Sequence, residues 1–153
     1  MKNILVTGSD GFIGKNLIQA LKRLEDVKVY GYDINDDINP LKEAVRRADI
    51  IFHLAGVNRP EKTEEYETGN VGFTRTLISM VEEYKVKPLI IFSSSIQAAL
   101  DNPYGLSKRK AEEELINWAK RSGQAVVIYR LPNVFGKWCR PNYNSAVATF
   151  CYN

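Results

Sequence analysis

Short, continuous apolar runs alternate along the chain with longer segments in which apolar residues recur at helical spacing. The short runs predict strands at residues 3–7, 27–32, 49–56, 88–92 and 124–130. The amphipathic segments predict helices at residues 12–24, 41–47, 63–84 and 104–121. Strands that alternate with helices form a parallel sheet with helices on its faces. We therefore expect one α/β domain over residues 1–153, a doubly wound Rossmann-type fold with the strand order 3-2-1-4-5.

A glycine-rich turn separates the first predicted strand from the first predicted helix. Gly8, Gly11 and Gly14 recur there at every third position. Glycines at such a turn let the backbone approach a pyrophosphate, and the amino terminus of the following helix supplies N–H groups and a partial positive charge. The spacing differs from the G-x-G-x-x-G fingerprint, so a simple glycine turn is the alternative. The order of strand, turn and helix favours a dinucleotide-binding loop.

Asp33 follows the second predicted strand. Dinucleotide-binding folds place an acid there, about twenty residues after the glycine loop, to bind the adenosine ribose. A carboxylate accepts hydrogen bonds from both ribose hydroxyls and repels a 2′-phosphate, so Asp33 favours NAD over NADP. Ile34 offers no positive charge to reverse this preference. The alternative is a turn aspartate in the acidic stretch 33–37.

Two polar features follow the fourth predicted strand. Ser93, Ser94 and Ser95 stand at its carboxyl end, the edge at which an α/β sheet binds its ligand, although a polar turn also explains them. Tyr104 and Lys108 are four residues apart, so on a helix they share one face. A fixed positive charge beside a phenol lowers its pKa, and such a pair moves protons near neutral pH. A solvated tyrosine beside a lysine is the alternative.

Composition narrows the class of function. The 153 residues are 44% hydrophobic and 25% charged, with a net charge of +3, which is ordinary for one folded domain. Basic residues are interleaved with acidic ones, so we expect a small-molecule ligand and no binding to nucleic acid or membranes. Within residues 108–114 this interleaving predicts that most of the charge forms a solvated helix face. The apolar runs are far shorter than the ~20 residues of a membrane-spanning helix, and no signal-type region develops, so we expect a cytoplasmic protein.

The cysteines and the histidine of the chain do not form a metal-binding pattern. Cys139 and Cys151 have no metal-ligand partners at a useful spacing, and His53 is the only histidine. We therefore expect free thiols and no metal site. We interpret His53 as a packed or hydrogen-bonded strand residue, because no nucleophile or metal ligand lies near it in the sequence.

Taken in order, the glycine loop, the acidic strand end, the serine cluster and Tyr-x-x-x-Lys resemble the extended short-chain dehydrogenase/reductases, the NAD-dependent epimerase/dehydratase family. The resemblance covers the whole chain. Longer strings at residues 53–61, 93–97, 101–105, 135–139 and 141–145 are similar to reductases of capsular polysaccharide synthesis. They imply a nicotinamide-dependent reduction of a UDP-linked 4-keto-6-deoxy sugar.

The resemblance also assigns roles to individual residues. In this family a serine hydroxyl and a tyrosine phenol bind the carbonyl oxygen, the phenol donates the proton, and a lysine holds the ribose and the tyrosine. The matching positions are Ser95, Tyr104 and Lys108, with Ser95 chosen by register with related epimerases. Asn133 matches an asparagine that contacts the diphosphate of the nucleotide sugar. The implied cofactor-binding positions are Gly8, Gly11, Phe12, Ile13, Gly14, Asp33, Ala55, Gly56, Asn70 and Lys108.

The resemblance sets further expectations about cofactor, length and assembly. The reductases that the chain resembles are expected to use NADPH, whereas the charge of Asp33 favours NAD. In the family a sixth strand, a sugar-binding region and a separate metal-binding domain follow. We therefore expect residues 1–153 to be an amino-terminal fragment, truncated before the sugar-binding region and without a second domain. A homodimer formed through helices is also implied.

Two other functions stay open on the sequence. A nucleotide-sugar 4-epimerase would use the same residues and keep its cofactor bound, and a truncated chain would bind a dinucleotide without catalysis. A 4,6-dehydratase is less favoured, because Ile96 and Gln97 follow Ser95 where that elimination requires an acid pair. The reductase and the epimerase both assign proton transfer to Tyr104.

Overall fold

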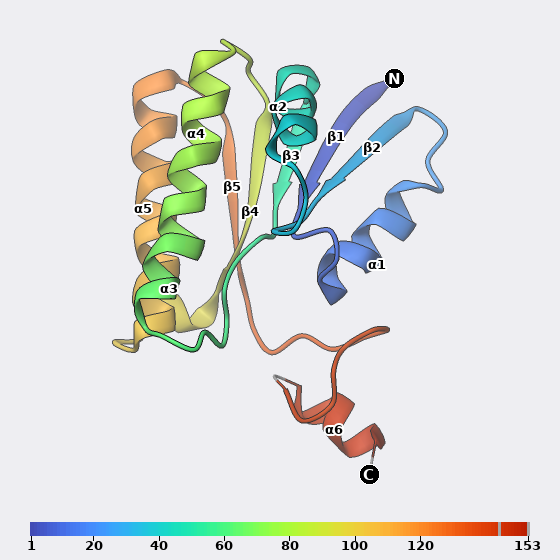
Figure 1. Cartoon of the computed structure of the whole chain (residues 1–153), viewed down its shortest axis with the longest axis vertical. Coiled ribbons are helices and arrows are strands. Elements are labelled where there is room, and N and C mark those ends of the chain that lie inside the picture. The colour runs from blue at the N-terminus through green and yellow to red at the C-terminus, as the bar shows by residue number, and fades with distance from the viewer. Residues whose placement is uncertain (144, 153) are drawn as a thin grey trace.

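The computed structural model describes residues 1–143 and 145–152 (Figure 1). The strands are β1 (Lys2–Thr7), β2 (Val27–Tyr32), β3 (Ile50–His53), β4 (Leu89–Ser95) and β5 (Val126–Leu131). The α-helices are α1 (Phe12–Leu21), α2 (Ile38–Arg47), α3 (Glu64–Tyr66), α4 (Phe73–Glu83), α5 (Pro103–Ser122) and α6 (Ala146–Tyr152). A π-helix, η1 (Glu67–Gly72), joins α3 to α4, and a 3-10 helix, η2 (Ile96–Ala99), follows β4. The predicted helix at residues 63–84 is therefore interrupted by a π-helical turn.

The described strands form one parallel sheet in the order β2-β1-β3-β4-β5. The predicted Rossmann-type α/β fold is confirmed, and the predicted strand order 3-2-1-4-5 is wrong. β3 pairs with β1, with Ile50 beside Ile4, instead of extending the sheet beyond β2. Residues 33–49, between β2 and β3, form α2 and its turns. They contain no apolar run that could add a strand to the sheet beyond β2. The chain therefore crosses back over β1, and β2 stays at the edge.

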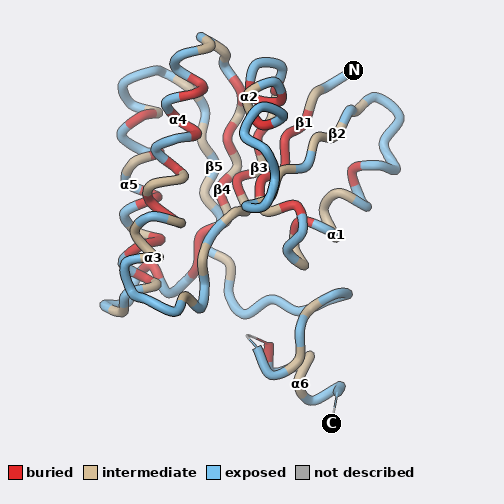
Figure 2. Tube along the Cα trace, in the orientation of Figure 1, coloured by how far each residue is buried: buried red, intermediate tan, exposed pale blue. Residues whose placement is uncertain are grey.

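Helices pack on both faces of the sheet. α1 covers one face, where Leu17, Ile18 and Leu21 meet Ile4 and Val6. α2, α4 and α5 cover the other face. The connections that contain them lead along the sheet from β2 toward β5, whereas the connection through α1 leads the opposite way, from β1 to β2. Their core includes Leu5, Leu41, Val45, Ile51, Leu77, Val81, Ile90, Phe92, Leu115 and Trp118. Buried residues are accordingly concentrated in the central strands and the helices packed on them (Figure 2).

Part of the face that carries α1 is open to solvent. Val127 and Tyr129 on β5 are 37% and 56% exposed, and no described helix packs over them. After β5, the described residues 132–143 and 145–152 leave the layers of the sheet and end in α6 (Figure 1). In the described part of the chain, no helix is both long enough and apolar enough to cross a membrane.

The start of α5 is fixed by local sequence. Asn102 has an extended backbone, and its side-chain oxygen accepts a hydrogen bond from the N–H of Gly105 at 2.8 Å. Pro103 follows as the first helical residue, where its missing N–H costs nothing. The helix ends at Gly123, whose φ of +70° suits glycine. This start places Tyr104 in the first turn of α5, close to the end of β4.

Candidate active site

The candidate site lies at the carboxyl ends of β1, β3 and β4. The chain after β1 passes to one face of the sheet and the chain after β3 passes to the other, so these two strand ends form the topological switch point. Open α/β sheets bind their ligands at such a point. Three predicted segments meet there: the glycine loop after β1, residues 54–56 after β3, and the serine cluster at the end of β4.

The glycine loop leaves no room for side chains at two positions. Gly8 has a φ of +73°, and a Cβ there would lie 2.7 Å from the backbone nitrogen of Ala55. A Cβ at Gly14 would collide with the carbonyl oxygen of Gly8. Among the described residues, no side chain caps the amino terminus of α1. The first-turn N–H groups, which include those of Phe12 and Ile13, are therefore available to an anionic ligand.

Asp33 lies directly beside the glycine loop. Its Oδ2 accepts a hydrogen bond from the N–H of Asp10 at 2.8 Å, and its Oδ1 accepts one from the N–H of Ile34 at 2.8 Å. Its own N–H donates to Oδ2 of Asp36 at 2.7 Å. Asp33 is therefore a turn aspartate that also joins the end of β2 to the glycine loop, and its role as a ribose ligand stays a prediction. Each carboxylate oxygen keeps a second lone pair for a ligand.

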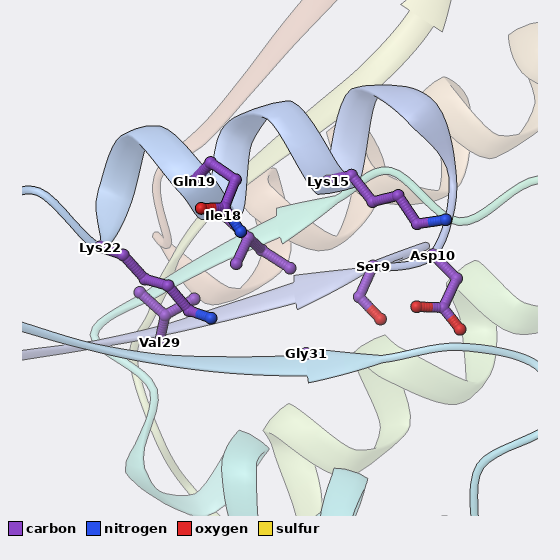
Figure 3. Close-up of a pocket in the computed structure, with 8 residues that line it drawn as sticks. All are labelled: Ser9, Asp10, Lys15, Ile18, Gln19, Lys22, Val29 and Gly31. Carbon is purple, nitrogen blue, oxygen red and sulfur yellow. The ribbon is translucent and has the colours of Figure 1, made fainter. Parts of the chain in front are cut away.

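A pocket of about 330 Å³ lies beside the glycine loop, between α1 and β2 (Figure 3). The residues that line it are Ser9, Asp10, Lys15, Ile18, Gln19, Lys22, Val29 and Gly31. Lys15 extends toward Ser9 and Asp10 at one end of this pocket (Figure 3). The pocket is separate from the residues predicted to transfer protons, since none of them lines it.

The structure brings Ser95 and Tyr104 together beyond β4, and Lys108 follows one turn later on α5. Ser95 is the last residue of β4, and its Oγ accepts a hydrogen bond from the N–H of Gln97 at 3.2 Å as η2 begins. A Cβ on Gly105 would collide with the carbonyl oxygen of Gln97, so α5 and η2 are in direct backbone contact. This contact sets the position of Tyr104 relative to Ser95.

Tyr104 is a protonated phenol at neutral pH. Burial raises its pKa, and the nearby Ser95 hydroxyl offsets only part of that rise. The ring of Tyr66, which lies 5.9 Å from the Tyr104 ring, also raises the pKa. The prediction that Lys108 lowers the pKa of Tyr104 is wrong in this structure. Burial dominates, and the Lys108 ammonium is directed elsewhere.

Lys108 is almost fully buried, with 4% of its surface exposed. Its Nζ lies 4.5 Å from the centroid of the Phe92 ring on β4, and a Cβ at Gly56 would lie 3.5 Å from it. Burial lowers the pKa of Lys108 to about 8, against the opposite effect of the Glu112 carboxylate. Lys108 is therefore charged at neutral pH, and its ammonium reaches the loop after β3.

Asn70, predicted to bind the cofactor, lies in η1 and joins two parts of the site. Its Oδ1 accepts a hydrogen bond from the N–H of Val57 at 2.8 Å. Its Nδ2 donates to the Val57 carbonyl oxygen at 3.1 Å and to Oγ of Ser107 at 2.8 Å. A Cβ on Gly56 would lie 2.8 Å from Oδ1. The Asn70 amide therefore connects the loop after β3 to α5, directly behind Gly56.

His53 is fully buried and connects β1, β3 and α4. Its Nδ1 lies 3.0 Å from Oγ1 of Thr7, and its Nε2 lies 2.9 Å from Oγ1 of Thr74. Thr74 donates its own proton to the carbonyl oxygen of Asn70 at 2.7 Å, so it accepts from a protonated Nε2. Burial lowers the pKa of His53 to about 3, and Lys108 adds to the effect. The interpretation of His53 as a hydrogen-bonded strand residue is confirmed.

Asn133 lies apart from these contacts. Asn133 is exposed, two residues after β5, and the pairing of Leu131 with Ser95 places it at the same edge of the sheet.

Two charged residues near the site could not be identified from the sequence. Glu112 and Arg130 form an ion pair at 2.6 Å next to Lys108. The prediction of a solvated helix face over residues 108–114 is wrong for Glu112, which is 3% exposed.

The fold is that of the Rossmann-type domains of the extended short-chain dehydrogenase/reductase class. Residues 4–151 match the NAD dependent epimerase/dehydratase family, and the chain belongs to this family. The resemblance seen in the order of the sequence motifs is thereby confirmed.

Curated relatives include enzymes that act on nucleotide sugars. The chain is 51% identical over 150 residues to a UDP-2-acetamido-2,6-beta-L-arabino-hexul-4-ose reductase from Pseudomonas aeruginosa, covering 98% of this chain and 40% of that protein. It is 29% identical over 182 residues to a UDP-glucose 4-epimerase from Vibrio cholerae, covering 94% of this chain and 55% of that protein. The chain thus spans about half or less of the length of these relatives.

Solved structures show the same relationship. The capsular polysaccharide assembling protein CapF from Staphylococcus aureus matches with a TM-score of 0.86 and 47% identity, over 98% of this chain and 41% of that one. A UDP-glucuronic acid 4-epimerase from Bacillus cereus, solved in complex with NAD, matches with a TM-score of 0.81 and 25% identity, over 93% of this chain and 60% of that one.

Proposed function

We propose that this chain forms the cofactor-binding and proton-transfer part of a nicotinamide-dependent reductase. Its substrate would be a UDP-linked 4-keto-6-deoxy sugar used in surface polysaccharide biosynthesis. The observation that carries the proposal is the pairing of Tyr104 with Ser95 beyond β4, while Lys108 on the same helix reaches Gly56 in the loop after β3. The 51% identity to a reductase of a UDP-linked hexulose supports this substrate class.

The residues present suit a dinucleotide. The glycine loop lets a pyrophosphate approach the backbone, and the free N–H groups of α1 favour its negative charge. When bound, the nicotinamide supplies the hydride that the carbonyl carbon of the sugar accepts. The residues that we propose to hold the dinucleotide are Gly8, Gly11, Phe12, Ile13, Gly14, Asp33, Ala55 and Gly56, with Asn70 and Lys108 behind Gly56.

Tyr104 supplies the proton of the reaction. Its phenol is protonated at neutral pH because burial raises its pKa, and the Ser95 hydroxyl lies beside it. Two O–H groups therefore converge where the carbonyl oxygen of the sugar would lie, and both polarise it. We propose that the positive charge of Lys108, which shares a face of α5 with Tyr104, stabilises the phenolate that remains after proton transfer, across the one turn of helix that separates the two residues. One hydride and one proton convert the ketone to an alcohol.

We propose NADH as the cofactor and Asn133 as a contact for the diphosphate of the sugar nucleotide. The Asp33 carboxylate is held against the glycine loop by the N–H groups of Asp10 and Ile34, where it would repel a 2′-phosphate. NADPH, which the resembling reductases are expected to use, would require Lys15 in the neighbouring pocket to offset this charge. Asn133 is exposed at the same edge of the sheet as Ser95.

Replacing the phenol tests the proposed chemistry. We predict that the full-length protein oxidises NADH stoichiometrically when given a UDP-linked 4-keto sugar. Tyr104→Phe should lower this rate at least about 100-fold, as expected for loss of a general acid, and leave dinucleotide binding intact. Tyr84→Phe is the matched control, because Tyr84 directly follows α4 and its ring lies 4.4 Å from the Arg46 guanidinium. Absorbance of NADH and calorimetric titration give the two readouts.

Other outcomes separate the alternatives. Equal turnover in Tyr104→Phe would refute the role of the phenol. Interconversion of sugars without net oxidation of NADH would identify an epimerase, the activity named for the Vibrio cholerae relative. Dinucleotide binding with no conversion of any keto sugar by the full-length protein would leave a binding module.

A further inference from the structure

Glu112 is a buried acid one helical turn after Lys108. Four residues separate the two, so both side chains lie on the same face of α5. Only 3% of Glu112 is exposed, and carboxylates are almost never buried to this extent unless they are paired. Dinucleotide binding and proton transfer do not by themselves require an acid at this position.

Arg130 on β5 holds the Glu112 carboxylate. Its Nε donates to Oε1 at 3.0 Å and to Oε2 at 3.2 Å, and its Nη2 donates to Oε2 at 2.6 Å. Two nitrogens of one planar guanidinium thus fix the orientation of the carboxylate. Burial alone would raise the pKa of Glu112, but Arg130, the neighbouring Ser94 hydroxyl and Lys108 lower it overall. Glu112 is therefore ionised at neutral pH.

The charge around Lys108 is dominated by Glu112. Among the described residues, the titratable groups near the ammonium are His53 on β3, Tyr104 and Glu112 on α5, and Arg130 on β5 beyond Glu112. His53 is neutral because its pKa is lowered to about 3, and Tyr104 is a protonated phenol. The Arg130 side chain is 48% exposed, whereas that of Glu112 is 4% exposed, so water screens the positive member of the ion pair more strongly.

We propose that Glu112, held by Arg130 on the buried face of α5 that carries Lys108, is a positioning residue that keeps the Lys108 side chain charged at the end of β3. For catalysis this inference rests on the proposed function, because Lys108 stabilises a phenolate only as an ammonium. Without the Glu112 charge, burial would act on Lys108 unopposed, and the ammonium would lose its proton closer to neutral pH. Glu112 would then set the upper pH limit at which the site works.

The direct test is the titration of Lys108 in the 153-residue chain, followed by NMR with ¹³C-labelled lysine. The Lys108 signal is identified by its loss in Lys108→Arg. We expect a midpoint near pH 8 in the unaltered chain and a midpoint lower by about one pH unit in Glu112→Gln. Glu114→Gln is the matched control on the same helix, because Glu114 pairs with Arg75 at 2.7 Å and should leave the midpoint unchanged. An unchanged midpoint in Glu112→Gln overturns the proposal.

A second variant guards against loss of fold. The double variant Glu112→Gln with Arg130→Gln leaves no unpaired charge, so it carries the same test if the single variant does not fold. Its Lys108 midpoint should also fall, because the nearer charge dominates. If the midpoint does not fall, or if neither variant folds, Glu112 serves only the fold and the proposal is overturned.

Activity gives an independent readout in the full-length protein. Glu112→Gln should move the alkaline decline of kcat/KM to lower pH, in the same direction as the Lys108 midpoint. The NMR titration requires no turnover. Absence of reductase activity would therefore refute the proposed function alone, and an unmoved Lys108 midpoint would refute this inference alone.

Discussion

Lys108 is a charged group that folding removes from water. Burial lowers its pKa from 10.5 to about 8, so between these pH values the unfolded chain binds a proton that the folded chain has lost. The free energy of unfolding therefore rises as the pH increases from about 8 toward 10.5. Below pH 8 the folded protein bears the cost of the buried charge, which for this shift is about 3 kcal/mol.

We predict that Lys108→Met stabilises the protein at neutral pH. Methionine keeps an apolar stem and removes the ammonium, so the free energy of unfolding at about pH 7 should rise by about 1–3 kcal/mol. The contribution of Lys108 to the increase between about pH 8 and pH 9.5 should also disappear. Urea unfolding at these pH values measures both effects. Lys110→Met is the control, since Lys110 is an exposed partner of Glu67 at 2.9 Å; the same stabilisation in both variants would contradict the prediction.

At the residue scale, spacing identified the partners at the site but not their charge states. Tyr104 and Lys108 share a helix face whatever surrounds them, so their proximity could be predicted. Their pKa values depend on burial, and for Lys108 that burial involves Phe92 on β4 and Gly56 in the loop after β3. A run of alternating charges likewise gave no reason to separate Glu112 from its exposed neighbours, because its burial follows from folding α5 onto the sheet beside Arg130.

At the scale of elements, the corner between η2 and α5 determines where Tyr104 lies. Gly105 leaves no space for a Cβ beside the carbonyl oxygen of Gln97. We predict that Gly105→Ala lowers the free energy of unfolding by about 1–3 kcal/mol, as overpacking does. It should also move Tyr104 away from Ser95 and reduce turnover in the full-length protein. Urea unfolding and a rate assay measure these effects.

Gly136→Ala is the matched control for Gly105→Ala. No described atom lies within 4 Å of a Cβ built at Gly136, and Gly136 is not among the glycines with positive φ. The same substitution there should change stability by less than about 0.5 kcal/mol. If the two variants lose stability equally, the contact between Gly105 and Gln97 does not explain the effect.

Most strands and the longer helices could be predicted from the period of the apolar residues, because that period follows from burial of one face. The strand order could not, because the pairing of β3 with β1 depends on how the segment of residues 33–49 folds. The π-helical turn of η1 was missed for a similar reason. Asn70 in that turn bonds to Val57 and Ser107, which lie 13 and 37 residues away in the sequence.

For the whole molecule, the residues proposed to bind the dinucleotide and the sugar differ in their surroundings. Gly8 of the glycine loop approaches the backbone of Ala55 after β3, and Asp10 of the same loop donates its N–H to the Asp33 carboxylate. Asn133 is exposed beyond β5, next to the open face formed by Val127 and Tyr129. We therefore expect dinucleotide binding to be measurable in these 153 residues, independently of sugar reduction.

We predict that calorimetry of the 153-residue chain shows NADH bound at least about tenfold more tightly than NADPH, a difference of about 1.4 kcal/mol. The Asp33 carboxylate would face the 2′-phosphate, and two like charges about 4 Å apart repel by about 1–4 kcal/mol near a protein surface. Asp33→Asn should remove this preference. In Asp37→Asn the preference should persist, because Asp37 caps α2 through Asn39 and asparagine caps equally well. Tighter binding of NADPH would mean that Lys15 outweighs Asp33, and binding of neither would refute the dinucleotide loop.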